Sequence, residues 1–193
     1  MRCMNRHLLL LALCQGLFLT NNVTFMAING LVGLALAPVG WMATLPVTGY
    51  VVGAALSAMP VARLQARVGR QRSFQVGLLV AAVSAAACAF AVTLGSFWLL
   101  VLSTLVAGFY SANGALYRFA GPELVPQGLK ERAISWVLAG GVVGAFIGPN
   151  LANLTRGWLP VPFAGAYLAL VGVALLSLAI MSFIRFPAHV APV

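Results

Sequence analysis

The chain has 193 residues, of which 62% are hydrophobic and 7% are charged, and its formal net charge is +9 at pH 7. Soluble domains carry about 25% charged residues, so this composition excludes an ordinary soluble protein and indicates a membrane protein. A basic chain can bind nucleic acid, but here the cations lie in short segments between apolar runs. Contact with anionic lipid head groups explains them better. We therefore expect the lipid bilayer as a partner and no nucleic acid.

Six apolar stretches are each long enough to cross a bilayer, which requires about 20 helical residues. The sequence predicts an all-α membrane protein, a single six-helix transmembrane domain over residues 1–193. Its first stretch follows Arg2 and Arg6 like a signal peptide, but it continues too far for one, so we expect an uncleaved helix. The predicted helices cover residues 8–36, 42–61, 74–94, 97–119, 133–154 and 163–184.

The cations are distributed unevenly among the gaps between these stretches. Ten of the eleven Lys and Arg residues lie before the first stretch, in the second gap, in or beside the fourth gap or after the last stretch, and only Arg156 lies in the fifth gap. Lys and Arg are retained on the cytoplasmic side during insertion. The pattern therefore predicts a multi-pass protein of the cell inner membrane with both termini in the cytoplasm. Trp41, Trp98 and Trp158 fall at the predicted outer helix ends, where interfacial anchors are expected.

The connections between the helices also have a regular order. A short outer turn, a basic inner loop and a short outer turn join the first four helices. This order suits two inverted three-helix repeats, residues 1–94 and 95–193, as in transporters built from units of opposite orientation. The two segments share no strong residue-level repeat, so this prediction rests on topology.

The segment between the second and third helices reads ARLQARVGRQR over residues 62–72. It resembles the signature loop of the major facilitator superfamily, G-x-L-a-D-R-x-G-R-[RK]-[RK], which lies at the same place. The alternative is a generic basic inner loop, but position and the R-x-G-R core favour the family. Ala62 and Ala66 replace the family's glycine and acid. That acid helps to clamp the two halves of the family's transporters in the outward-open state, so its absence puts the clamp in doubt here. The matching residues are Leu64, Arg67, Gly69, Arg70 and Arg72.

The fifth helix contains a second motif of this kind. Gly140, Gly144 and Gly148 recur every four residues and form one smooth face, against which another helix can pack closely. Pro149 follows and favours a bend. Small-residue packing is common in membranes, but the order resembles the glycine-rich helix-5 motif of the same superfamily, which ends in G-P.

The fourth helix departs from the family, because Thr104 stands where the family has an arginine four residues before a glycine, here Gly108. Residues 117–120 and 135–141 resemble a bacterial branch that includes riboflavin importers and CcoA-like copper importers. The resemblance covers nearly the whole chain, but only as the N-terminal six-helix half of a twelve-helix fold. It implies that a substrate binds between this half and a second one.

Polar residues in the first and fourth helices are the candidates for a substrate path. Gln15, Asn22 and Asn29 are spaced seven apart and share one helix face. Amides in hydrocarbon need partners, which are either another helix or a water-filled cavity, and the pattern leaves both open. The resemblance favours the cavity, because helices 1 and 4 line the substrate path of the superfamily. From the fourth helix we add Thr104, Ser111 and Tyr117, the last at the inner mouth.

Several kinds of chemistry are not supported by the residues present. The chain has no Asp, and its only acids, Glu123 and Glu131, lie in an inner loop, so it offers no intramembrane carboxylate for a proton relay. No H-E-x-x-H motif or carboxylate pair indicates an enzyme. We therefore predict no catalytic residues and no cofactor. A soft-ligand cluster could bind copper, but at a chain end it is weak evidence, and we predict no metal. Its members are Met1, Cys3, Met4 and His7.

The leading hypothesis is a half-size major facilitator protein that moves an unidentified small solute by alternating access. One half cannot enclose a site, so this hypothesis requires a homodimer or a separate C-terminal half. The alternative is a non-transporting membrane scaffold or assembly factor derived from a transporter. The missing acid of the signature loop favours that alternative.

Overall fold

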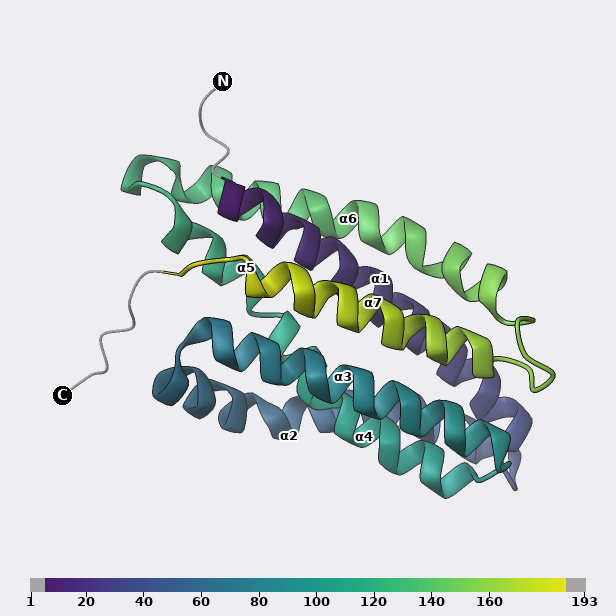
Figure 1. Cartoon of the computed structure of the whole chain (residues 1–193). Coiled ribbons are helices and arrows are strands. Elements are labelled where there is room, and N and C mark those ends of the chain that lie inside the picture. Colours follow the sequence, from purple (N-terminus) through teal and green to yellow (C-terminus); the bar gives the residue numbers. More distant parts are fainter. Residues whose placement is uncertain (1–5, 187–193) are drawn as a thin grey trace.

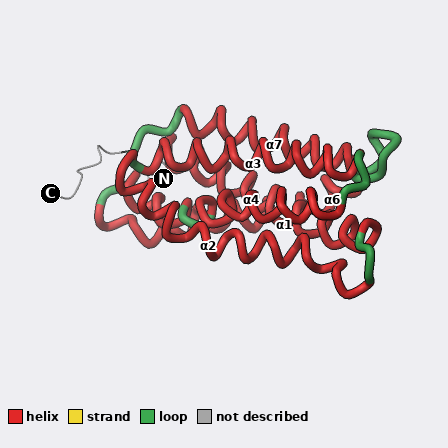
Figure 2. Tube along the Cα trace, turned by 90° about the horizontal axis from the view of Figure 1, so that it is seen from below, coloured by secondary structure: helices red, strands yellow, loops and turns green. Residues whose placement is uncertain are grey.

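Six helices of the computed structural model are long and apolar enough to cross a membrane, and they run side by side (Figures 1 and 2). The structure describes residues 6–186, in which no strand occurs. The long helices are α1 (Arg6–Leu36), α2 (Leu45–Val68), α3 (Arg70–Thr93), α4 (Phe97–Gly114), α6 (Lys130–Thr155) and α7 (Ala164–Ser182). The short helical segments are η1 (Gly40–Thr44), α5 (Tyr117–Ala120), η2 (Gly121–Leu124) and η3 (Gln127–Leu129).

The predicted inner loop over residues 62–72 is wrong in extent, because this segment is almost entirely helical. Helix α2 continues to Val68 and α3 begins at Arg70, so Gly69 alone separates them. The Arg, Leu, Gln and Ala residues of the segment are good helix formers, and their charges do not end a helix. Gly69 ends it by adopting φ 84° and ψ 166°, a conformation essentially restricted to glycine.

Two other predicted boundaries also change. The fourth helix ends at Gly114 rather than near residue 119, and Tyr117–Ala120 forms the separate helix α5. A Cβ at Gly114 would collide with the Phe18 ring, so this end of α4 lies directly against α1. Helix α6 runs from Lys130 to Thr155 with Pro149 inside it, and is one uninterrupted element at the position where the sequence favoured a bend.

The long helices pack in definite pairs. Helix α1 packs along α6 and α7, α2 packs along α4, and α3 packs along α4 and α7. The first and last described residues lie at the same end of the bundle as α5 and the α2–α3 junction (Figure 1). We call this the cationic end, since all Lys and Arg residues between 6 and 186 except Arg156 belong to segments at this end. Trp41, Trp98 and Trp158 are exposed near that opposite end.

Glycines make the closest interhelical contacts. In the α1–α6 interface a Cβ at Gly144 would collide with the backbone of Gly16, and a Cβ at Gly140 would collide with that of Ala12. At Gly148 it would lie 3.0 Å from the carbonyl oxygen of Thr20. The α2–α4 interface is equally close, because a Cβ at Gly108 would collide with the backbone of Gly53. Only residues without a side chain allow helices to approach so closely.

Candidate functional site

Helix α1 has six polar side chains in its membrane span, and four of them bond to neighbouring helices. The Thr20 hydroxyl donates to the Gly144 carbonyl at 2.9 Å, and the Thr24 hydroxyl donates to the Gly148 carbonyl at 2.7 Å. On the other side of α1, the Asn21 amide donates to the Leu170 carbonyl of α7 at 3.1 Å. These bonds satisfy polar groups that hydrocarbon would leave without a partner.

Asn29 is also fully paired. Its amide nitrogen donates to the Phe25 carbonyl at 2.8 Å, and its oxygen accepts the Tyr167 hydroxyl of α7 at 2.8 Å. Both Asn29 and Tyr167 are completely buried. Asn29 therefore belongs to the packing between α1 and α7. Its side-chain oxygen has a partner, whereas those of Gln15 and Asn22 do not.

Gln15 and Asn22 differ from the other polar residues of α1. The buried oxygens Oε1 of Gln15 and Oδ1 of Asn22 have no hydrogen-bond partner among the described residues. Gln15 is 5% exposed and its side chain lies against Gly141 of α6, while Asn22 is partly exposed. The two residues are two helical turns apart on one face of α1, so this face carries two unused acceptors.

The predicted residues of α4 and α5 are not brought together around an open space. Thr104 is buried and its hydroxyl donates to the Val101 carbonyl of its own helix at 2.8 Å. Ser111 is partly exposed, close to the Tyr50 hydroxyl of α2. Tyr117 is 1% exposed, so it lies in the core rather than at a mouth.

An aromatic cluster explains the burial of Tyr117. Its ring packs edge-on against Phe74 of α3 at 4.6 Å and against Phe18 of α1 at 5.8 Å, measured between ring centroids. Phe18 also packs edge-on against Tyr110 of α4 at 5.3 Å. Edge-on aromatic pairs stabilise packing beyond the area that they bury, so this cluster joins α1, α3, α4 and α5 near the cationic end.

A narrow crevice beside this cluster contains another unused polar group. Asn21, Tyr50, Ser84 and Tyr110 line it from four different helices, and it is too narrow to hold a water molecule. The Tyr110 hydroxyl is buried there without a hydrogen-bond partner among the described residues. Sequence reasoning missed Tyr50 and Ser84, because tyrosine and serine are ordinary in a membrane helix.

The signature segment is tied to the α4–α6 connection by contacts that the sequence did not reveal. Arg70 Nη2 lies 2.7 Å from Glu123 Oε1, which is the one ion pair between residues 6 and 186. Beneath it, the Asn113 amide of α4 donates to the Ser73 carbonyl at 3.1 Å, and the Ser73 hydroxyl donates back to Asn113 Oδ1 at 3.2 Å. The sequence offered one clue to this ion pair, because Glu123 is one of only two acidic residues in the chain.

No group of three or more His, Cys, Asp and Glu side chains in the described part of the chain could hold a metal ion. Of the cluster considered for copper, Met1, Cys3 and Met4 lie outside the described residues. His7 Nδ1 accepts the Arg185 backbone N–H at 3.4 Å, so this ring nitrogen has a protein partner.

Comparison with known proteins agrees with this geometry. The model of the Major Facilitator Superfamily matches residues 8–192. The chain is 35% identical to the riboflavin transporter RfnT of Brucella anthropi over 183 residues, which are 94% of this chain and 46% of that protein. It is 31% identical to the uncharacterized MFS-type transporter YdeG of Bacillus subtilis over 58% of this chain and 26% of that protein. It is 39% identical to the drug efflux pump JefA of Mycobacterium tuberculosis over 56% of this chain and 21% of that protein. The chain therefore spans less than half the length of each of these relatives.

Proposed function

The chain belongs to the major facilitator superfamily, and we propose that its six helices form one wall of the path along which a small solute crosses the membrane by alternating access. The family and the names of the relatives indicate a multi-pass membrane transporter rather than an enzyme. The family and the relatives do not extend to alternating access, the second wall or the identity of the solute, which are part of our proposal.

The observation that best supports a solute path is a pair of buried hydrogen-bond acceptors on α1 without partners among the described residues, Gln15 Oε1 and Asn22 Oδ1. A buried acceptor without a partner is unfavourable by about 1–3 kcal/mol, and a solute with N–H or O–H donors removes this penalty when it binds. The only acids of the chain, Glu123 and Glu131, lie at the cationic end rather than on this face. The face therefore suits a neutral solute that carries hydrogen-bond donors.

We propose further that a second six-helix unit covers this wall, either as a second copy or as a C-terminal half. The least buried helices support this. Only 22% of the apolar windows of α2 and α6 are buried, against 44–56% in the other four helices. Helix α6 exposes Asn150 and Asn153 as well, and amides are poorly suited to a lipid-facing surface.

The packing pairs support the division into inverted repeats of residues 1–94 and 95–193. Exchanging the first, second and third long helices with the fourth, fifth and sixth converts the α1–α6 pair into the α4–α2 pair. The same exchange converts the α1–α7 pair into α4–α3 and leaves the α3–α7 pair unchanged. All of these pairs are in contact, which is the pattern that two units of opposite orientation produce.

Riboflavin is the first solute to test, because the relative aligned along 94% of this chain is named as a riboflavin transporter. The chain, with its C-terminal half where one exists, is expressed in a bacterium that can neither make nor import riboflavin. We expect uptake of labelled riboflavin, and we expect Asn22→Leu to abolish it while folded yield stays normal. Gln127→Leu, a comparable change at an exposed amide outside the long helices, is the control. Cysteines placed at Asn22 should also cross-link between two copies, or to the C-terminal half.

The scaffold alternative gives the opposite outcome. It is adopted if the chain is monomeric in native membranes without a partner half, or if leucine at Gln15, Asn22 and Asn29 together leaves the cellular phenotype intact. Uptake that depends on Asn22 but excludes riboflavin keeps the transporter and changes the solute.

We also propose that the protein lies in the cell inner membrane with the cationic end in the cytoplasm, since nine of the ten Lys and Arg residues between 6 and 186 belong to segments at that end. Reporter fusions at Gly95 and Pro160 should report the outside, and fusions at Gln71 and Gly128 the inside. A periplasmic signal at Gln71 would overturn this orientation.

A further inference from the structure

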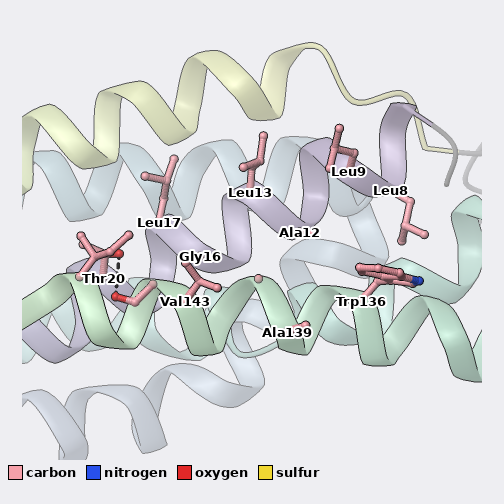
Figure 3. A pocket seen from close by; sticks show the side chains of 13 residues that line it. Leu8, Leu9, Ala12, Leu13, Gly16, Leu17, Thr20, Trp136, Ala139 and Val143 are labelled. Atoms are coloured by element: carbon pink, nitrogen blue, oxygen red, sulfur yellow. Dashed lines mark hydrogen bonds between the residues drawn. The ribbon is translucent and has the colours of Figure 1, made fainter.

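Helix α1 borders two hollows of opposite character. The longer one is an apolar groove between α1 and α6 (Figure 3), lined by Leu13 of α1 and by Trp136 and Val143 of α6. Trp136, Val143 and Asn150 are seven residues apart and share the exposed face of α6. The groove therefore belongs to the wall that we assign to the second six-helix unit.

The second hollow is a pocket of about 360 Å³ at the cationic end. Arg6 and His7 line it from the start of α1, and Ser182, Phe183 and Arg185 line it from the end of α7 and the residues that follow. None of these residues belongs to α2 or α6, the two helices that we propose face the second unit. The pocket is thus separate from that wall.

The hydrogen-bond acceptors at the end of α7 already have donors. Gln71 Nε2 of α3 lies 3.4 Å from the carbonyl oxygens of both Met181 and Ser182. The Ser182 hydroxyl donates to the Leu178 carbonyl at 2.9 Å and accepts from Gln75 Nε2 at 3.2 Å. The end of α7 therefore offers few free acceptors to a molecule in the pocket.

The free polar groups of the pocket are donors. The Arg185 backbone N–H donates to His7 Nδ1 at 3.4 Å, so a neutral His7 carries its own proton on Nε2. The guanidinium groups of Arg6 and Arg185 add donors that are always charged. Within residues 6–186 the one ion pair joins Arg70 to Glu123, so neither pocket arginine has a carboxylate partner there. This combination suits an anion.

An exposed apolar face of α7 begins at this pocket. Phe183, which lines the pocket, is 66% exposed, and Leu168, Leu175 and Leu176 are each about half exposed. Their spacings of seven and eight residues place them on one broad face of the helix. Helix α7 is not assigned to the second unit, so this face meets the acyl chains of the bilayer.

We infer that the pocket binds the phosphate of an anionic phospholipid between Arg6 and Arg185, with an acyl chain along the exposed face of α7. Guanidinium groups bind phosphate through charge-assisted hydrogen bonds. A soluble phosphate has the same head chemistry but would leave the apolar face of α7 without a contact. A choline head group brings a cation that the two arginines repel, so the site favours a lipid with net negative charge.

Quenching of a tryptophan at position 183 by brominated lipids tests this site. Phe183→Trp places the reporter beside the pocket, and the four native tryptophans are replaced by Phe. The full chain is reconstituted in phosphatidylcholine vesicles that contain an equal small fraction of either brominated phosphatidylglycerol or brominated phosphatidylcholine. We expect the anionic lipid to quench more strongly, by at least about two-fold. Equal quenching by both lipids would overturn the inference.

A second reporter on the same helix shows whether the preference is local. Leu168→Trp, in the same background without native tryptophans, lies on the exposed face at the opposite end of α7. We expect the two brominated lipids to quench it equally. An equal preference at both positions would mean that anionic lipid gathers around the whole protein, and the pocket would not be a site.

Paired variants distinguish the pocket from general surface charge. Arg6→Gln with Arg185→Gln should remove the preference for phosphatidylglycerol at position 183. Arg63→Gln with Arg67→Gln removes the same charge from exposed positions of α2 and should keep it. Size-exclusion yield shows that each variant is folded. If both pairs lose the preference equally, the surface potential explains the binding and the site is wrong.

Competition with inorganic phosphate identifies the source of the phosphate group. We expect an excess of phosphate, at constant ionic strength, to leave the quenching by phosphatidylglycerol unchanged, because phosphate lacks the chain that contacts α7. Loss of the preference in phosphate but not in an equal concentration of chloride would show that the pocket takes a soluble phosphate, and the lipid would be the wrong ligand.

Discussion

The α1–α6 and α2–α4 interfaces are equally close but are held in different ways. In both, glycine backbones touch, at Gly16 and Gly144 in one and at Gly53 and Gly108 in the other. Across the α1–α6 interface, two threonine hydroxyls of α1 also donate to carbonyls of α6. Between α2 and α4 the hydrogen bonds join side chains instead, Tyr50 with Ser111 and the Gln65 amide with Asn113 Oδ1 at 3.5 Å, while the Thr104 hydroxyl bonds to its own helix.

This difference separates how closely two helices approach from how they are positioned along each other. The glycines determine how closely two helices approach, because a Cβ on either helix would collide with the other backbone. The threonine bonds fix the position of α1 along α6. At the cationic end, the Asn113–Ser73 and Arg70–Glu123 contacts join α3 to α4 and to η2.

The largest effect is expected from Gly144→Leu. A leucine there must displace the Gly16 backbone, so we expect the free energy of unfolding to fall by about 3 kcal/mol or more, with a marked loss of folded yield in detergent. Thermal unfolding and size-exclusion yield measure this. Gly172→Leu on α7 is the control, because a side chain there meets nothing within 4 Å. Wild-type behaviour of Gly144→Leu would contradict the close contact.

The equal closeness of the two interfaces is tested by a smaller change. Gly53→Ala and Gly144→Ala each place a Cβ against a backbone carbonyl, of Leu105 and of Gly16 respectively. We expect both to destabilise by about 1–3 kcal/mol, and by similar amounts. Chemical denaturation in mixed micelles gives both values, with Gly172→Ala as the reference. Destabilisation by only one of them would show that the interfaces are unequal.

The threonine bonds should contribute less than the glycine contacts. Thr20→Val and Thr24→Val keep the shape and remove one interhelical bond each, so we expect a loss of about 0.6 kcal/mol per residue. Thr104→Val breaks a bond within its own helix and should change stability less. If Thr104→Val is as destabilising as the other two, the distinction between the interfaces fails.

The smallest effect is expected at the start of α3, where Arg70 pairs with Glu123 of η2. Arg70 and Glu123 are 28% and 39% exposed in their side chains, and partly exposed ion pairs contribute about 0–1 kcal/mol. Glu123→Gln should therefore lower stability slightly in low salt and not at all in high salt. Unfolding at two ionic strengths measures this, and Glu131→Gln is the control. A loss that persists in high salt would show that Glu123 acts through something other than this pair.

Much of the fold could be predicted, because hydrophobic length and charge placement depend only on local sequence. The six spans follow from such patterns, and so does the spacing of Gly140, Gly144 and Gly148. Gly53 and Gly108 were missed as an interface, because spacing within one helix does not identify the partner helix. The break after Gly114 was missed as well, since no proline marks it; the close packing of Gly114 against the Phe18 ring of another helix leaves no pattern in the sequence.

The candidate site was less predictable, because spacing identifies a face but not its partners. Gln15, Asn22 and Asn29 share one face in the sequence, yet Asn29 is paired with Tyr167, which lies 138 positions away. Arg70 was noticed for its motif and Glu123 for its rarity, but their contact depends on how α5 and η2 fold back. Such pairings arise from tertiary packing and leave no periodic pattern.

The single residue between α2 and α3 has a consequence for the speed of any rearrangement at the cationic end. With only Gly69 outside the two helices, a change in the angle between them must occur through the two soft backbone torsions of that residue. The barrier between two arrangements of α2 and α3 is then set largely at one position. A side chain there would disfavour the observed φ of 84° by about 1–3 kcal/mol. It would therefore alter the rate at which the two helices change their angle, while leaving every other contact in the bundle available.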